Sequence, residues 1–132
     1  MTVFEKIVAG DIPCYKVAET DKFLAFLDVS PIKEGHVLVI PKVAVDYIFD
    51  LDDDMYSGLT LFAKKVANAI DASIPCERVG VAVVGLEVPH AHIHLIPIHE
   101  VGDVSFANPK LNLSPERMTE IAKTISSAFQ LA

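Results

Sequence analysis

The sequence predicts a single domain of the α+β class, with helices flanking an antiparallel sheet. A chain of 132 residues fits one domain. Short apolar runs follow one another with hairpin-like links, and two longer segments carry apolar residues at helical spacing. The resulting order, α-β-β-β-α-β-β-α, groups the strands instead of alternating each one with a helix, which favours an antiparallel sheet.

The N-terminal part of the chain predicts a short helix and three strands. Apolar side chains share one face over residues 3–9, and Gly10 ends that helix. Strand-like runs follow at 15–19, 22–28 and 36–41, and a two-residue turn joins the first pair. Links this short allow neighbouring strands to run antiparallel.

The two clearest helices are predicted at residues 52–72 and 114–129. Aspartates suit the start of the first, and Ser114 is the expected N-cap of the second. The predicted buried positions are, in the first helix, Met55, Leu59, Phe62, Ala63, Val66 and Ile70 and, in the second, Met118, Ile121, Ala122, Ile125 and Phe129. Residues 78–84 predict another strand, and about residues 98–132 form a C-terminal extension with a loop and the final helix.

The composition limits the classes of partner. Hydrophobic residues make up 52% of the chain and the mean hydropathy is +0.40, yet no run approaches the ~20 apolar residues that a membrane span requires. The surplus apolar surface favours an interface between subunits. A formal net charge of -7 argues against nucleic-acid binding. The two cysteines form no CxxC pair and follow no signal peptide, which predicts free thiols in a cytoplasmic protein.

The segment PHAHIHLIPIH, residues 89–99, holds four of the five histidines. Side chains alternate along a strand, so His90, His92 and His94 are expected to point to one open face while the intervening apolar residues face the helices. Rings at this spacing disfavour joint protonation, so a row of three purely structural histidines would lower stability to no purpose. A functional site is therefore the stronger interpretation.

Two kinds of functional site are compatible with the row. A zinc site would use a common ligand, with Glu87 as an assisting carboxylate, but the outer two rings lie roughly 13 Å apart along a strand. A catalytic site would use neutral imidazole as a nucleophile at phosphorus, with neighbouring rings orienting it and handling protons and charge. The second interpretation uses every position of the row and is preferred.

Three further motifs accompany the histidine row. IVAGDIP, FLAFLDVSP and GHVLVIPK precede it, and residues 90–96 fit the pattern His-φ-His-φ-His-φ-φ, where φ is apolar, at every position. In content, order and spacing these motifs resemble the histidine-triad (HIT) family of nucleotide hydrolases and transferases, over about residues 3–97. The resemblance implies a HIT-like antiparallel sheet with helices and a homodimer formed through the long helix and an adjoining strand.

The resemblance also implies a reaction. In the family, the middle histidine attacks the α-phosphorus of a nucleoside phosphoramidate or anhydride, and water then hydrolyses the nucleotidyl-histidine to release a nucleoside monophosphate. His92 matches that nucleophile. His94 would contact the phosphate, His90 would help to hold the site, and His36 matches a supporting histidine near the nucleophile.

Further positions match the nucleotide-binding wall of the family. Asp28 matches the acid that accepts hydrogen bonds from the ribose hydroxyls, although it also suits a plain turn. The residues that match the base-binding wall, and that equally suit core packing, are Phe4, Ile7, Ile12, Phe26 and Val29. Such a wall favours a purine, so the expected ligand is AMP-like. His99 is either a further contact to phosphate or a loop histidine.

The sequence departs from the family pattern just before the histidine row. The loop is several residues short, an apolar residue near Val83 or Val84 replaces an asparagine, and Leu86 stands where glutamine is usual. Glu87 falls near the leaving group, where a carboxylate favours an amine over an anion. Support for the phosphate is therefore thinner, and electrostatic support is often the largest catalytic contribution.

The zinc ligands of some family members are also missing. The N-terminal helix holds no CxxC, and Ala44 replaces a histidine after the IPK motif. We therefore expect no bound metal and no cofactor. The predicted function is a purine-preferring nucleotide hydrolase with a covalent nucleotidyl-histidine intermediate. The alternatives are a nucleotide-binding module with little turnover, a dinucleoside polyphosphate hydrolase and a metal-dependent hydrolase.

Overall fold

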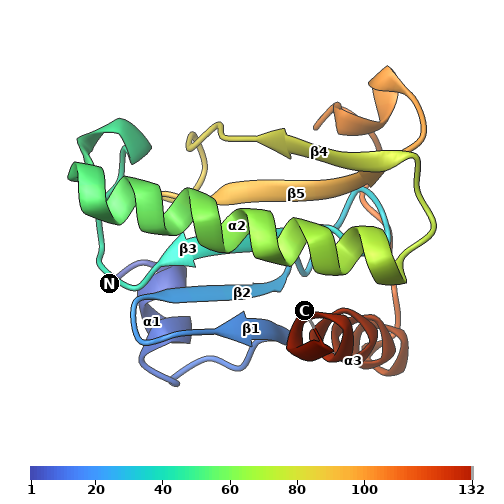
Figure 1. Ribbon diagram of the computed structural model, residues 1–132, viewed down its shortest axis with the longest axis horizontal. Coiled ribbons are helices and arrows are strands. Elements are labelled where there is room, and N and C mark those ends of the chain that lie inside the picture. The colour runs from blue at the N-terminus through green and yellow to red at the C-terminus, as the bar shows by residue number, and fades with distance from the viewer. Residues whose placement is uncertain (132) are drawn as a thin grey trace.

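The computed structural model describes residues 1–131 and contains one antiparallel sheet of five strands, in the order β1-β2-β3-β5-β4 (Figure 1). The strands are β1 (Lys16–Glu19), β2 (Phe23–Leu27), β3 (Val37–Pro41), β4 (Arg78–Ala82) and β5 (Ile93–Ile98). The helices are α1 (Val3–Val8), α2 (Asp53–Ser73) and α3 (Pro115–Leu131), with short 3₁₀ helices η1 (Ile48–Asp50) and η2 (Val101–Val104). The α+β class and the order of helices and strands are confirmed, and the sequence pattern did not indicate the 3₁₀ helices.

Side-chain caps set where the helices begin. Thr2 and Glu5 form a capping box at α1, in which each side chain accepts a hydrogen bond from the other's backbone N–H, at 3.0 and 3.1 Å. Asp52 caps α2 through a 2.8 Å bond from the backbone N–H of Met55. Ser114 caps α3 as predicted, through a 3.1 Å bond from the backbone N–H three residues later.

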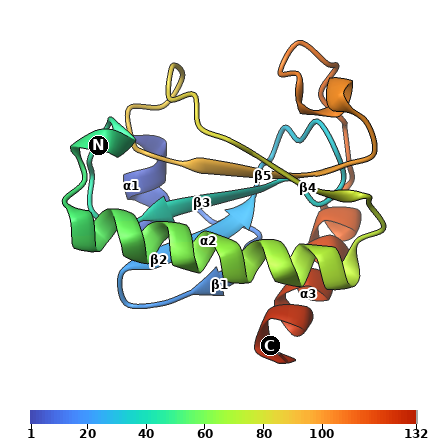
Figure 2. The ribbon, with the colours of Figure 1, turned by 45° about the horizontal axis from the view of Figure 1, so that its top comes forward.

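The helices α2 and α3 cover one face of the sheet (Figure 2). Beneath them lie alternate residues of the central strands, among them Ala25, Val39 and Leu95. The predicted helix positions complete this cluster, although Met55 and Phe129 are only partly buried. Among residues 1–131, no helix combines the length and the apolar character of a membrane span.

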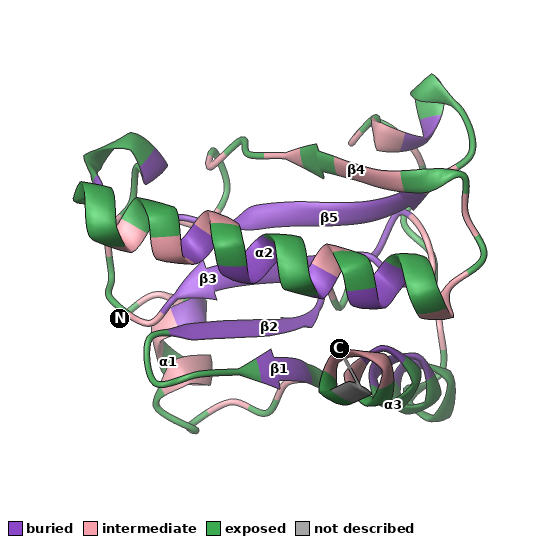
Figure 3. Cartoon of the chain, in the orientation of Figure 1, coloured by how far each residue is buried: buried purple, intermediate pink, exposed green. Residues whose placement is uncertain are grey.

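The opposite face of the sheet is covered by α1 and carries a second apolar cluster. Phe4 packs there against residues of β2 and β3, including Phe26 and Leu38. His94 is paired with Leu38 in the β3–β5 ladder, so its side chain lies on this second face. Figure 3 shows that both faces of the central strands are buried, as two-sided coverage requires.

Strand β5 begins later than the sequence predicts. It starts at Ile93, so the first two histidines of the row precede it. Continued by two residues, its register with β3 would place Ala91 opposite Pro41, and proline has no N–H with which to continue the ladder. The Ala91 N–H donates instead to the Val45 carbonyl, at 2.7 Å.

The histidine row is buried, whereas the sequence analysis expected an open face. His90 is 0% exposed, His92 is 6% exposed and His94 is 8% exposed. The predicted alternation nevertheless holds, because Ala91 and Ile93 belong to the cluster beneath α2 and α3. The pattern of one strand shows which way its side chains point but not what packs above them. Here Phe4 of α1 packs on His90 and His92, and Phe106 packs on His94.

The C-terminal extension is tied to the segment between β2 and β3. The ties are a 2.7 Å hydrogen bond from Leu111 N–H to the Pro31 carbonyl, a 3.1 Å ion pair between Lys33 and Asp103, and a two-pronged ion pair at 2.9 Å between Arg117 and Glu34. The final helix α3 packs on α2 and β1. The extension therefore belongs to the same packed domain as the sheet.

Candidate active site

A cavity of about 470 Å³ lies on the α1 side of the sheet. Its wall contains eight of the residues expected to form the site: Phe4, Ile7, Ile12, Phe26, Asp28, Val29, His92 and His94. The volume is within the range of pockets that bind small organic ligands. Segments from α1, β2, β3 and the start of β5 thus bring together residues that the sequence separates by up to about 90 positions.

Three of the expected site residues do not line the cavity. His36 and His90 are buried behind it, at 1% and 0% exposure. His99 follows the end of β5 and is exposed, and its backbone N–H donates to Asp103 at 2.8 Å. Because β5 carries the chain roughly 16 Å beyond His94, the structure does not bring His99 to the cavity.

The hydrogen bonds of His92 fix which ring nitrogen is free. Its Nδ1 lies 2.7 Å from the backbone carbonyl of His90. A carbonyl oxygen only accepts, so Nδ1 carries the proton and Nε2 of the neutral ring keeps its lone pair. The ring of Phe4 packs edge-on against His92, with centroids 5.1 Å apart. The arrangement presents a fixed imidazole with a nucleophilic nitrogen at the cavity wall.

His90 helps to hold the ring of His92 in place. Its Nε2–H donates to the Pro41 carbonyl at 2.8 Å, which anchors the ring to the end of β3. Its backbone carbonyl is then in place to accept from His92. The other ring nitrogen of His90, Nδ1, is buried and finds no hydrogen-bond partner among the described residues. Leaving a buried acceptor unpaired costs on the order of 1–3 kcal/mol, which marks His90 as a residue whose placement lowers stability.

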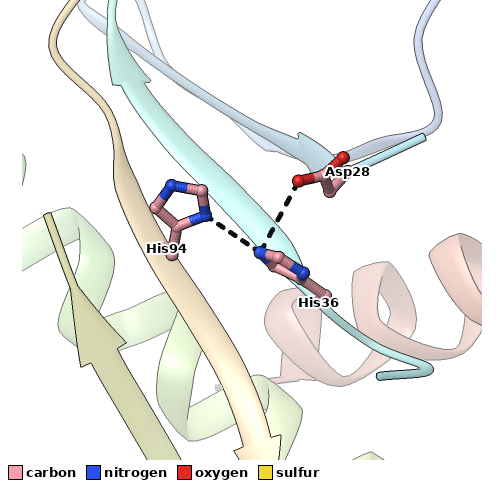
Figure 4. A group of neighbouring side chains, drawn as sticks. All are labelled: Asp28, His36 and His94. Atoms are coloured by element: carbon pink, nitrogen blue, oxygen red, sulfur yellow. Dashed lines mark hydrogen bonds and ion pairs between the residues drawn. The ribbon is translucent and has the colours of Figure 1, made fainter. Parts of the chain in front are cut away.

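His36 and His94 form a directed chain of hydrogen bonds. The Ile32 backbone N–H donates to Nδ1 of His36 at 3.2 Å, so the His36 proton lies on Nε2. That Nε2–H donates to Nδ1 of His94 at 3.0 Å (Figure 4). His94 must then carry its own proton on Nε2. The backbone N–H of Ile32 thereby determines which nitrogen of His94 carries the proton. The Nε2–H of His94, a residue that lines the cavity, is suited to donate a hydrogen bond to a phosphate oxygen.

Asp28 serves both the turn and the cavity. One carboxylate oxygen accepts from the Ser30 backbone N–H at 2.9 Å, which holds the turn after β2. The other lies 3.7 Å from Nε2 of His36, too far for a hydrogen bond (Figure 4). The two alternatives predicted for Asp28, a turn residue and a site residue, therefore both hold. One of its carboxylate oxygens is engaged in the turn, and the other is not.

Asp28, His36 and His94 are close enough to be considered as metal ligands. One ligand atom from each residue lies within 4.8 Å of the others. The Ile32 N–H already occupies the Nδ1 lone pair of His36, so a metal at Nε2 would have to displace that proton and leave the ring anionic, or break a buried hydrogen bond. These three side chains therefore suit a chain of hydrogen bonds with fixed proton positions better than they suit a metal site.

Burial keeps the two rings of this chain neutral. Loss of water around the ring, followed by the nearby charge of Lys110, lowers the pKa of His36 to about 4. Loss of water also lowers the pKa of His94 to about 4, with smaller contributions from His36 and His92. Both rings are therefore neutral at pH 7, as the chain of hydrogen bonds requires.

These shifts predict an acid-sensitive fold. Between pH 6.5 and 4 the unfolded histidines bind protons that the folded ones do not, so the free energy of unfolding falls as the pH falls through this range. From pH 7.5 to 4.5, wild-type protein should lose about 2 kcal/mol more than His36→Asn. Asparagine can still accept from Ile32 but does not titrate. Urea unfolding at both pH values measures the difference.

His99→Asn is the matched control, because His99 is exposed and bonds through its backbone. It should show the same loss of stability on acidification as wild type. An equal pH dependence in wild type and His36→Asn would contradict the assignment of the buried neutral rings.

One part of the cavity wall was not predicted from the sequence. Phe106 and Lys110, from the loop between η2 and α3, line it. The Phe106 ring packs edge-on against His94, with centroids 4.7 Å apart. No spacing pattern in the sequence signals this contact, because it depends on the loop folding back to bond with Pro31.

The loop before the histidine row forms another part of the cavity wall. From the sequence, this loop stood out only because it departs from the family pattern. Val84, Gly85, Leu86 and Glu87 line the cavity from this loop. Leu86 is 88% exposed and Gly85 adopts a φ of 74°. The wall therefore lacks side-chain amides at the positions where the sequence analysis noted their loss.

Comparisons with known proteins agree in pointing to one family. A family model described as HIT domain matches residues 9–101. The chain is 37% identical over 134 residues to adenosine 5′-monophosphoramidase hnt1 of Schizosaccharomyces pombe, covering 97% of this chain and 98% of that protein. Its fold is similar to that of a Hit-like protein involved in cell-cycle regulation from Bartonella henselae, with a TM-score of 0.83, 28% identity and coverage of 96% and 95%. A zinc-bound histidine triad family protein from Mycobacterium smegmatis also has a TM-score of 0.83, with 27% identity and coverage of 98% and 93%.

Proposed function

Since this chain belongs to the histidine-triad (HIT) family, we propose that it hydrolyses a nucleoside phosphoramidate, or a nucleotide phosphoanhydride, and releases a nucleoside monophosphate. The observation that carries the proposal is the His92 ring at the cavity wall, with its proton held on Nδ1 by a backbone carbonyl. The relative from Schizosaccharomyces pombe is named an adenosine 5′-monophosphoramidase, which favours the phosphoramidate.

The proposed reaction has two steps at one phosphorus atom. Nε2 of His92 attacks the α-phosphorus as the bond to the leaving group breaks, and the leaving group takes up a proton from solvent. The ring in the nucleotidyl-histidine carries a positive charge, which the His90 carbonyl stabilises through Nδ1–H. Water then attacks the phosphorus and releases a proton to solvent, the P–N bond breaks with its electron pair returning to Nε2 of His92, and the monophosphate leaves. Throughout, Nε2–H of His94 donates to a non-bridging phosphate oxygen.

The rest of the cavity suits an AMP-like ligand. Phe4, Ile7 and Phe26 offer an apolar wall for a purine, and the free oxygen of Asp28 can accept from the ribose hydroxyls. Glu87 lies at the same cavity, where its carboxylate favours release of an amine over release of an anion. We therefore propose a purine phosphoramidate as the preferred substrate and a dinucleoside polyphosphate as a poorer one.

Mass spectrometry tests the intermediate directly. Wild-type protein mixed with adenosine phosphoramidate and quenched within one turnover should carry an added AMP on the peptide that contains His92, and AMP should accumulate on longer incubation. Activity should survive an excess of chelator. Tight AMP binding with neither adduct nor product would instead identify a nucleotide-binding module, and loss of activity in chelator would identify a metal-dependent hydrolase.

We also propose that the protein is a homodimer. Among residues 1–131, strand β4 pairs with β5 alone and so leaves its other edge unpaired, and Val81 on that strand is 66% exposed. Val83 and Val84, which follow it, are exposed as well. A second copy that covered this edge would pair its backbone groups and bury apolar surface. Sedimentation should give twice the 14.4 kDa chain mass, and Val81→Lys should lower it toward the monomer.

A further inference from the structure

Lys110 stands out at the cavity because of its charge. The whole chain has a formal net charge of -7, and two carboxylates, Asp28 and Glu87, line the cavity. Among the described residues that line it, Lys110 is the single lysine or arginine. An anionic ligand that enters this cavity therefore meets one permanent positive charge from the protein.

Phe106 places Lys110 beside the histidines. Nζ of Lys110 lies over the Phe106 ring, 5.6 Å from its centroid, in a cation–π contact. The same ring packs 4.7 Å from His94 and 6.4 Å from His36, measured between centroids. The backbone bond from Leu111 to the Pro31 carbonyl, next to Lys110, fixes this part of the loop to the turn that holds Asp28.

The charge of Lys110 is not neutralised by a carboxylate. Other lysines have such partners: Lys33 pairs with Asp103, and both Lys16 and Lys42 pair with Glu19. In the described part of the chain no ion pair within 4.0 Å involves Lys110. Its field instead reaches His36 and His94, where it contributes to the lowered pKa of each ring.

The loop before the histidine row offers a phosphate group little support from its side chains. Val84, Gly85 and Leu86 bring no side-chain amide or hydroxyl to the cavity. His94 supplies one donor through the chain from Ile32, but a phosphate has several charged oxygens. A cation at the same cavity would offset the remaining charge as the nucleophile approaches phosphorus.

We propose that Lys110, supplied by the C-terminal loop and held over Phe106, binds the phosphate oxygens of the nucleotide and takes the place of the polar side chains that the loop before the histidine row lacks. The proposal rests on the proposed function for the identity of the ligand. It assigns a binding and catalytic residue to the part of the chain beyond the residues that match the family model.

Binding of AMP and of adenosine separates a phosphate contact from a structural role. In calorimetry, Lys110→Gln should weaken AMP binding about tenfold or more and leave adenosine binding within about twofold of wild type. Lys110→Arg should keep most of the AMP affinity, because it keeps the charge. The expected fall of AMP affinity with added salt should be smaller in Lys110→Gln than in wild type.

Lys123→Gln is the matched control. Lys123 is exposed on α3, in the same C-terminal segment, and does not line the cavity. This variant should bind AMP and adenosine as wild type does. Equal losses for AMP and adenosine in Lys110→Gln, or no loss for either, would overturn the assignment of Lys110 to phosphate.

The outcomes for the proposed function and for Lys110 can be told apart. If wild-type protein binds AMP through Lys110 but forms no adduct and no product, the proposed hydrolase is wrong and the phosphate contact stands. If wild-type protein hydrolyses the phosphoramidate and Lys110→Gln does so with unchanged kcat/KM, the hydrolase stands and the Lys110 assignment is wrong. If wild-type protein binds neither AMP nor adenosine, both proposals fail.

Discussion

Replacing His92 by alanine is expected to lower kcat/KM for adenosine phosphoramidate by at least about 10³-fold, because the substitution removes the nitrogen proposed to form the covalent bond to phosphorus. Steady-state release of AMP measures the loss. The chain should remain folded, since the side chain removed makes one hydrogen bond, to the His90 carbonyl. Losing that bond should lower the free energy of unfolding by about 1 kcal/mol.

A second substitution distinguishes a nucleophile from a residue that only shapes the cavity. His92→Gly leaves a space the size of the missing ring, and added imidazole should restore part of the AMP release. The exposed His99, replaced by alanine, should keep full activity with or without imidazole. If His92→Ala retained more than about a tenth of wild-type activity while folded, His92 would not be the nucleophile.

Gly35→Ala is expected to destabilise the fold by about 3 kcal/mol, through backbone strain and overpacking together. Gly35 adopts a φ of 93°, a conformation that residues with a Cβ adopt only at a cost. A Cβ there would lie 3.1 Å from Cγ of Pro97 and 3.3 Å from Cγ1 of Ile74, both tighter than ordinary contacts. Because His36 is the next residue, the shift should also disturb the chain of hydrogen bonds to His94.

Gly10→Ala is the natural comparison for Gly35→Ala. Gly10 has a similar φ of 84°, but a Cβ there would meet nothing within 4 Å. Its substitution should therefore show the backbone strain alone, about 1 kcal/mol. Urea unfolding of the two variants isolates the packing contribution at Gly35, and equal losses would mean that Pro97 and Ile74 move aside freely.

Local sequence patterns were enough to predict the fold class and its helices, because helix spacing and capping depend on residues that are close together in the sequence. The helical spacing from Leu59 to Ile70 and the N-cap at Ser114 both reappear in the structure. The late start of β5 could also be explained locally, but only from the register between β3 and β5, which, if continued, would bring Pro41 opposite Ala91. A register across strands is a tertiary fact that one sequence does not contain.

The candidate site was predictable only in part for the same reason. Residues on the matching motifs, such as Asp28 and His92, do line one cavity. The direct partner of His36 proved to be His94, and its proton is placed by the Ile32 backbone, which has no side-chain signature. The position of Lys110 at the cavity could not be predicted from the sequence, because it depends on how a long loop folds back.

Helix α3 extends the folding unit beyond the residues that match the family model. That match ends at residue 101, yet α3 inserts four side chains into the cluster beneath α2: Met118, Ile121, Ala122 and Ile125. Each is at most 6% exposed. A fragment trimmed to residues 9–101 would keep the histidines but leave the apolar residues that α3 covers exposed to water, so the boundary of the family model divides a unit that must fold as one.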